Sequence, residues 1–145
     1  MIQRIQTLWL LLAGLVSAGV FYFDLYKGEV MLNGVATPTT LRVGPNLPLL
    51  LIAIVMTVLP LIAIGMFKNR KRQRSMTIMS IVIAVGFITA VIMQVGRFHD
   101  ANPTLINDTY WVGTVLPFIS IVFLILALQG IRKDDKLIKS LDRLR

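Results

Sequence analysis

Long apolar stretches alternate with short charged segments along the whole chain. Residues 5–23, 43–67, 75–96 and 109–131 contain no charged side chain. A helix of roughly 20 apolar residues is long enough to cross the hydrocarbon core of a bilayer. Because lipid cannot hydrogen-bond to the backbone, such stretches should be helical. The pattern predicts four transmembrane helices, near residues 7–23, 47–67, 75–95 and 113–131.

The first apolar stretch also resembles a signal peptide, because Arg4 precedes an apolar run. However, no pair of small residues stands before a mature soluble domain, and the run ends with Phe21, Tyr22 and Phe23. We therefore expect an uncleaved helix. The expected fold class is an all-α integral membrane protein, a bundle of four transmembrane helices.

The segment between the first two apolar stretches, residues 24–46, is the longest connection. Within Glu29–Val35 an Asn-Gly pair lies between apolar residues, which is a signal for a hairpin turn. We expect this segment to form a small β-hairpin that acts as a short outer cap on the bundle.

Basic residues set the expected orientation. All Lys and Arg residues except Lys27, Arg42 and Arg97 lie near the two termini or in the connection between the second and third stretches. Cytoplasmic segments of membrane proteins are enriched in Lys and Arg. The distribution predicts that both termini are cytoplasmic.

The last segment, residues 132–145, differs from the rest of the chain. Leu137, Leu141 and Leu144 fall on one side of a helix, and Lys136, Lys139 and Arg143 lie elsewhere around it. We expect a bundle over residues 1–131, followed by a basic amphipathic cytoplasmic helix. That helix could rest on anionic headgroups or dock on a cytoplasmic partner.

Composition excludes several kinds of site. The chain is 56% hydrophobic and 15% charged, and it has no cysteine and one histidine. A chain without cysteine has no thiol catalysis, disulfide or iron–sulfur cluster. One histidine is too few for a multi-histidine centre. We therefore expect no metal and no cofactor.

Polar residues of the second outer connection are the candidates for a catalytic site. Arg97, His99 and Asp100 follow the third stretch, and Asp24 and Asp108 are expected on the same face. A histidine beside an aspartate can act as a base, and an arginine can hold an anion. No nucleophile motif accompanies them, so an interfacial cluster of paired charges is the competing interpretation.

The connection between the second and third stretches is the most basic part of the chain. We expect it, together with Arg4, to bind anionic lipid or a partner protein; its basic residues are Lys68, Arg70, Lys71, Arg72 and Arg74. Although the net charge is +8, a short loop held at both ends in a bilayer is poorly suited to reading nucleic acid. We expect no nucleic-acid partner.

The opening sequence MIQRIQTLWLLLA, in which Gln3, Arg4 and Gln6 are distinctive, resembles the start of a known family. This is an uncharacterised family of small four-helix membrane proteins from Bacteroidota, a domain of unknown function. The resemblance implies a bacterial cytoplasmic, or inner, membrane. It implies no activity, cofactor or catalytic residue.

These features predict a non-enzymatic accessory or structural subunit of a larger membrane assembly, with a membrane protein or a second copy as partner. No Asp, Glu, Lys, Arg or His lies inside an apolar stretch, which argues against a proton-driven pump. A small transporter, channel or lipid-handling protein is the first alternative. An outer-face enzyme that uses His99 and Asp100 is the second.

Overall fold

The computed structural model describes the backbone of residues 2–32, 34–67 and 69–142, and side-chain burial for residues 5–31, 34–67 and 69–135. The helices are α1 (Ile2–Ala18), the 3-10 helix η1 (Gly19–Phe21), α2 (Leu47–Gly65), α3 (Arg70–Ala101) and α4 (Val112–Asp142). The strands are β1 (Tyr26–Leu32), β2 (Val35–Leu41) and β3 (Leu105–Tyr110).

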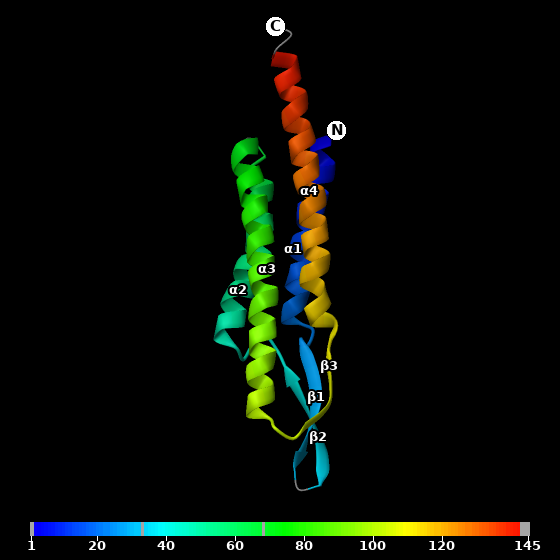
Figure 1. Cartoon of the computed structure of the whole chain (residues 1–145). Coiled ribbons are helices and arrows are strands. Elements are labelled where there is room, and N and C mark those ends of the chain that lie inside the picture. Colours follow the sequence, from blue (N-terminus) through cyan, green and yellow to red (C-terminus); the bar gives the residue numbers. More distant parts are fainter. Residues whose placement is uncertain (1, 33, 68, 143–145) are drawn as a thin grey trace.

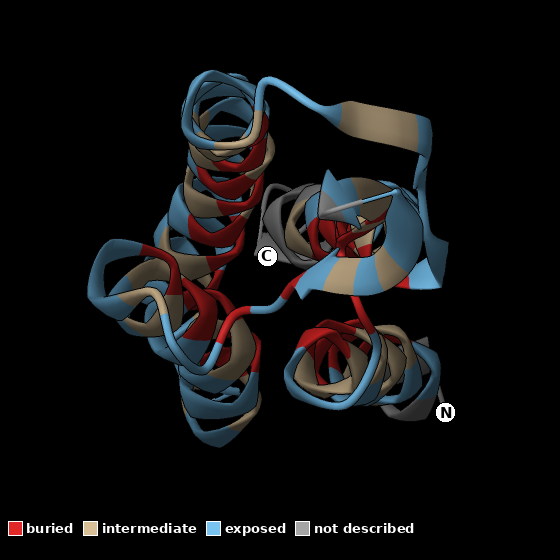
Figure 2. Cartoon of the chain, turned by 90° about the horizontal axis from the view of Figure 1, so that it is seen from below, coloured by how far each residue is buried: buried red, intermediate tan, exposed pale blue. Residues whose placement is uncertain are grey.

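The four long helices lie side by side (Figures 1 and 2). α1 packs against α2 and α4, and α3 packs against the same two helices. Buried side chains face the space between the helices, and two apolar clusters fill it. One cluster is centred on Phe87 and Met56, and the other on Leu10 and Leu124.

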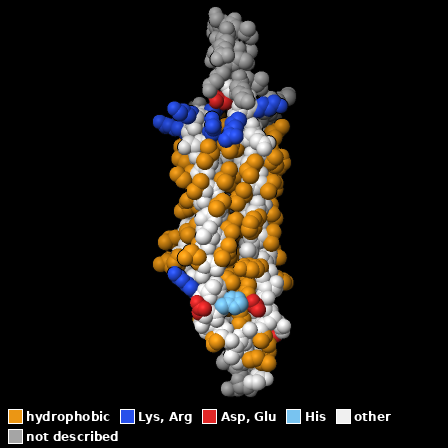
Figure 3. Space-filling model, viewed as in Figure 1, with side chains coloured by type: hydrophobic (Ala, Val, Ile, Leu, Met, Phe, Trp, Pro, Cys, Tyr) orange, Lys and Arg blue, Asp and Glu red, His pale blue; other side chains and the backbone are white. Residues whose placement is uncertain are grey.

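The outward faces of the helices are apolar. Large hydrophobic side chains such as Leu15, Val85 and Val122 are more than half exposed. In Figure 3 hydrophobic side chains form a broad apolar belt across the visible face of the helices, and Lys and Arg side chains line one edge of it, which we call the ring of Lys and Arg. We call that end of the helices the basic end, and the opposite end, where the strands lie, the sheet end. Water-soluble proteins rarely expose an apolar area of this extent.

Residues near the helix ends explain several boundaries. Asn46 precedes α2, and Pro48 lies in the first turn, where a missing N–H costs nothing. The Asn69 side chain accepts a hydrogen bond from the Arg72 N–H at 3.2 Å and so caps α3. At the other end of α3, the Asn102 N–H donates to the His99 carbonyl. These residues fix where α2 begins and where α3 begins and ends, and therefore how long the segments between the helices are.

The strands form one antiparallel sheet in the order β2-β1-β3. β1 and β2 pair from Tyr26↔Leu41 to Leu32↔Val35, so the predicted hairpin is present. Its turn contains Gly34 at φ 81°, a conformation that glycine adopts without strain. β3 returns from between α3 and α4 to the other side of β1, and the sheet projects beyond the helices (Figure 1).

The prediction of an all-α fold is therefore wrong. The outer cap is a three-stranded sheet that joins the connection after α1 to the connection between α3 and α4. A hairpin alone is marginal in water, and a third strand is the usual remedy. β3 supplies it from a segment whose Asn and Asp residues gave no strand signal.

The prediction of four transmembrane helices is also corrected. Among the described residues, α2, α3 and the Val112–Asp135 part of α4 are long and apolar enough to cross a membrane. The apolar part of the first helix, Ile5–Phe21, is shorter. Its regular α-helix ends at Ala18 because the chain tightens into the 3-10 turn of η1. The predicted boundary after Ile131 falls inside α4.

Candidate functional site

A hydrogen-bonded cluster of Tyr26, His99 and Asp108 lies at the sheet end. The Tyr26 hydroxyl is 2.8 Å from His99 Nε2 and donates to Asp108 Oδ2. His99 Nε2 is also 3.2 Å from Asp108 Oδ2. Tyr26 is buried in β1, whereas His99 and Asp108 are partly exposed on α3 and β3. The cluster therefore joins three segments that are far apart in sequence.

The environment sets the protonation of this cluster. Burial raises the pKa of Tyr26, and the hydrogen bond and charge of Asp108 raise it further. The hydrogen bond from Tyr26 lowers the pKa of Asp108 despite some desolvation, and His99 lowers it as well. A general base works best with a pKa near the working pH. The tyrosine stays protonated and the carboxylate stays charged, which suits a stable link between segments.

A second polar cluster surrounds Asp24, directly after η1. Arg42 donates to its carboxylate, and Lys27 Nζ lies 3.2 Å away. Burial alone would raise the pKa of Asp24, but the hydrogen bonds and charges of Arg42 and Lys27 hold it below the ordinary value. Lys27 also lies over the Trp111 ring, 4.1 Å from its centroid. This cluster ties both ends of the hairpin to the start of α4.

Backbone contacts complete the attachment of the sheet to α4. The Leu25 carbonyl accepts hydrogen bonds from the Trp111 N–H at 2.9 Å and from the Thr114 hydroxyl at 2.6 Å. The Gly113 N–H donates to the Asp24 carbonyl at 3.0 Å. The sheet is thus held to the helices by main-chain and side-chain contacts together.

The structure separates the predicted catalytic residues. His99 pairs with Asp108 and Tyr26, while Asp100 and Arg97 are exposed and take no part in that cluster. Asp24 belongs to the other cluster. Arg97, His99 and Asp100 all lie on α3, and of these three only His99 contacts Tyr26 and Asp108.

At the basic end, a buried carboxylate joins three helices. Asp134 of α4 accepts a 2.6 Å hydrogen bond from the Gln6 amide of α1 and lies 2.9 Å from Arg70 Nη1 of α3. Asp134 is only 6% exposed. A buried charge requires such partners, because desolvating it alone costs several kcal/mol.

The basic residues predicted to bind lipid or a partner lie around this buried link. Arg70, Lys71, Arg72 and Arg74 occupy the first turns of α3, and Arg72 is exposed. Arg4 is on α1, but its side chain is outside the described residues, as are the side chains of Leu137 and Leu141. Lys68 and Leu144 also lie outside the described residues.

Sequence analysis missed the central residues of both ends, Tyr26 and Asp134. Tyr26 looked like an interfacial aromatic next to an apolar stretch, and only the pairing of β1 with β3 brings it to His99. Asp134 could have been predicted to have a structural role, because it is an acidic residue within a basic segment, about one turn beyond the last apolar stretch. Its partner Gln6 was noted only as part of the opening.

Among the residues that the structure describes, no group of three or more His, Asp and Glu side chains is arranged to hold a metal ion.

Comparison with known proteins identifies the family but no characterised relative. Neither the curated proteins nor the solved structures contain a match to this chain. A family model matches residues 2–144, nearly the whole sequence. The chain therefore belongs to the family described as Domain of unknown function (DUF4293).

Proposed function

We propose that this chain is an integral protein of a bacterial cytoplasmic membrane and a non-enzymatic accessory subunit of a larger assembly. The observation that carries the proposal is the sheet presented beyond an apolar belt (Figures 1 and 3). The belt supports a bilayer location, and the ring of Lys and Arg supports a cytoplasmic basic end. The bacterial setting rests on the resemblance of the opening sequence.

The sheet supports a binding role because it is both fixed and exposed. Its attachments at Asp24 and Tyr26 restrict its motion, which lowers the entropy lost on binding. β2 is an edge strand, and Val35 is 63% exposed. Pro38 removes one edge N–H, so we expect contacts through side chains rather than addition of a strand.

The test is site-specific photo-crosslinking in native membranes. A photoreactive residue at Ala36, exposed on β2, should form a crosslink to one partner in near-stoichiometric yield. The same residue at Thr89, exposed on α3 within the belt, is the matched control and should crosslink to lipid. Mild extraction and mass spectrometry then identify the partner. If neither variant is crosslinked to another protein and the extracted chain is a monomer, the proposed subunit role is wrong.

A further inference from the structure

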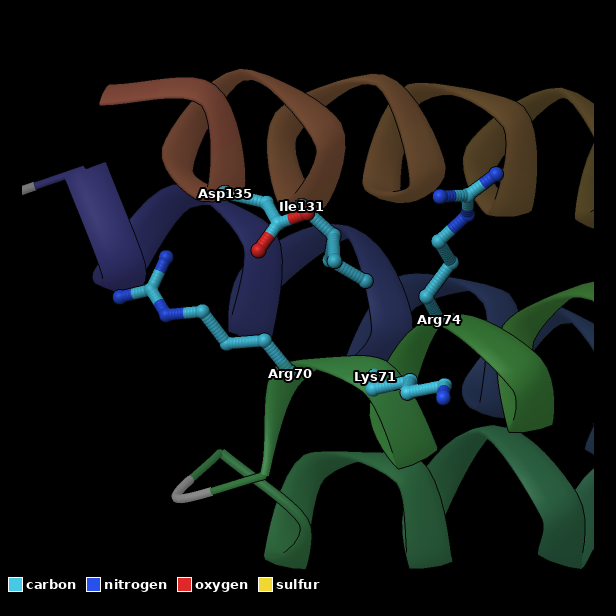
Figure 4. Close-up of a pocket in the computed structure, with 5 residues that line it drawn as sticks. All are labelled: Arg70, Lys71, Arg74, Ile131 and Asp135. Atoms are coloured by element: carbon cyan, nitrogen blue, oxygen red, sulfur yellow. The ribbon is translucent and has the colours of Figure 1, made fainter. Parts of the chain in front are cut away.

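A pocket of about 440 Å³ opens at the basic end, between the first turns of α3 and the adjoining part of α4. It is lined by Arg70, Lys71, Arg74, Ile131 and Asp135. In Figure 4, Arg70 and Arg74 stand on α3 on either side of Asp135 and Ile131, which belong to α4. The volume falls in the range of small-molecule sites.

The charge of the pocket favours an anion. Three cationic side chains line it with one carboxylate, Asp135, and even when the Asp134 carboxylate paired with Arg70 is counted, the cations outnumber the carboxylates by three to two. Arg70 also contacts the buried Asp134, which holds its guanidinium in place. Lys71 and Arg74 are exposed. The N-terminal end of α3 adds a positive dipole at the same place.

The position of the pocket favours an amphiphile. The ring of Lys and Arg directly adjoins the apolar belt (Figure 3), and Ile131 gives the pocket an apolar wall. A phosphate group can accept several charge-assisted hydrogen bonds from Arg and Lys, while an attached acyl chain can lie along the belt. Free phosphate would use the cations but not the belt.

We propose that this pocket binds the phosphate headgroup of an anionic phospholipid. The inference rests on the proposed membrane location, but not on the proposed partner. Lys71 and Arg74 hold the phosphate, and Arg70, fixed by Asp134, adds positive charge to the same pocket.

The test uses the purified full chain in neutral detergent, titrated with short-chain phosphatidylglycerol and followed by native mass spectrometry. Phosphatidylcholine of the same chain length and inorganic phosphate are the comparison probes. We expect phosphatidylglycerol to bind most tightly. The double variant Lys71→Gln/Arg74→Gln should bind it about tenfold more weakly or worse, because two charge-assisted contacts are lost.

A matched control removes the same charge outside the pocket. Arg72→Gln/Arg132→Gln changes one exposed cation on α3 and one on α4, and neither residue lines the pocket. This variant should bind phosphatidylglycerol like the unmodified protein. Equal losses in both double variants would mean a diffuse basic ring and would overturn the proposal.

A third variant guards against loss of binding through misfolding. Asp135→Asn removes the one carboxylate that lines the pocket, so phosphatidylglycerol should bind more tightly, and unfolding cannot produce such a gain. Unchanged or weaker binding counts against the site. If inorganic phosphate binds as tightly as phosphatidylglycerol, the ligand is a free anion and the lipid assignment is wrong.

Flotation with vesicles of neutral phosphatidylcholine tests the proposed membrane location independently of lipid binding in the pocket. Protein that stays with the vesicles after alkaline washing supports the location whatever the pocket binds. Protein that is stripped from the vesicles contradicts the location, even if phosphatidylglycerol binds in detergent.

Discussion

At the scale of single residues, Gly113, where α4 begins, is the glycine at which an added Cβ atom would meet its nearest neighbour. A Cβ atom at Gly113 would lie 2.5 Å from the Asp24 carbonyl oxygen and 2.9 Å from the Phe23 carbonyl oxygen. Both obstacles are backbone atoms, which cannot rotate away as a side chain can. Gly113 is therefore required by the junction between the sheet and the helices.

Gly113→Ala should lower the free energy of unfolding by about 1–3 kcal/mol, the usual cost of forcing extra volume into a packed site. Gly86→Ala is the matched control, since nothing lies within 4 Å of a Cβ there. Alanine also favours helix over glycine by up to about 1 kcal/mol. Thermal unfolding in detergent should show a lower midpoint for the first variant only. Equal midpoints for Gly113→Ala and Gly86→Ala would show that the backbone at the junction moves enough to accommodate the added methyl group.

At the scale of elements, the Tyr26 hydroxyl joins the sheet to α3, beside the contact between His99 of α3 and Asp108 of β3. Tyr26 contributes its ring to contacts with Phe98 and Tyr110 and its hydroxyl to His99 and Asp108. These two contributions can be separated by experiment, because phenylalanine keeps the ring and removes the hydroxyl.

Tyr26→Phe should leave the protein folded but loosen β3 from α3. Amide hydrogen exchange measured by mass spectrometry should become faster over residues 105–110, with little change over α2. Tyr22→Phe is the control, because Tyr22 is 84% exposed. Unchanged exchange in β3 would mean that strand pairing and the His99–Asp108 contact hold it without the Tyr26 hydroxyl.

The sheet attachment should also weaken in acid. The pKa of Asp24 and Asp108 is lower in the fold than the ordinary 3.8. Their contribution to stability is therefore complete above that value and is lost as the pH falls through the lowered pKa values. Tyr26 has a raised pKa relative to 10.0, so its contribution is lost only in strong base.

Thermal midpoints measured between about pH 5 and pH 3 should show this acid loss. Asp108→Asn should start from a lower midpoint and decline less steeply, because one of the two titrating groups is gone. Asp100→Asn, at an exposed position outside the cluster, should follow the unmodified protein. If the thermal midpoint declines with the same slope in all three proteins, the loss of stability in acid comes from groups other than Asp108.

At the scale of the whole molecule, the arrangement has two chemically different ends separated by an apolar belt. The absence of cysteine from the sequence makes this arrangement directly measurable. A single introduced cysteine then reports one position without removal of any other thiol.

In sealed vesicles, Ala36→Cys on β2 and Arg72→Cys on α3 should react with a membrane-impermeant maleimide from opposite sides. Val85→Cys is exposed in the belt and should be protected in intact vesicles. All three should react after denaturation. Labelling of positions 36 and 72 from the same side would contradict the proposed orientation.

The sequence was most informative where local chemistry decides the structure. Uncharged stretches located α2, α3 and α4, and the Asn-Gly pair located the β1–β2 turn. β3 could not be found in this way, because its strand character depends on pairing with distant β1. Asn107 has φ 52° inside it, and the β1–β3 register shifts between Lys27 and Glu29. Such irregular pairing leaves no alternating pattern in the sequence.

The candidate site was likewise predictable only in part: residue type and charge identified some of its residues, but not which of them lie in contact. His99 and Asp108 were both singled out by residue type and do lie together, but Tyr26, which contacts both, was not predicted as part of the site. Asp100 was selected because it is adjacent in sequence, and adjacency does not produce contact on a helix. The basic residues of α3 were found by charge, whereas the pocket depends on the approach of α4.

The strand order β2-β1-β3 has a consequence for how the protein is made. On the ribosome, the hairpin is complete before α2, α3 and β3 have been synthesised. The free edge of β1 can be filled only after α2 and α3 have carried the chain away from the hairpin and back to the same end. In the proposed membrane arrangement, the sheet therefore closes only in chains whose helices cross the bilayer in the right directions. A chain that is threaded wrongly keeps an open strand edge, which quality-control proteases and chaperones can recognise.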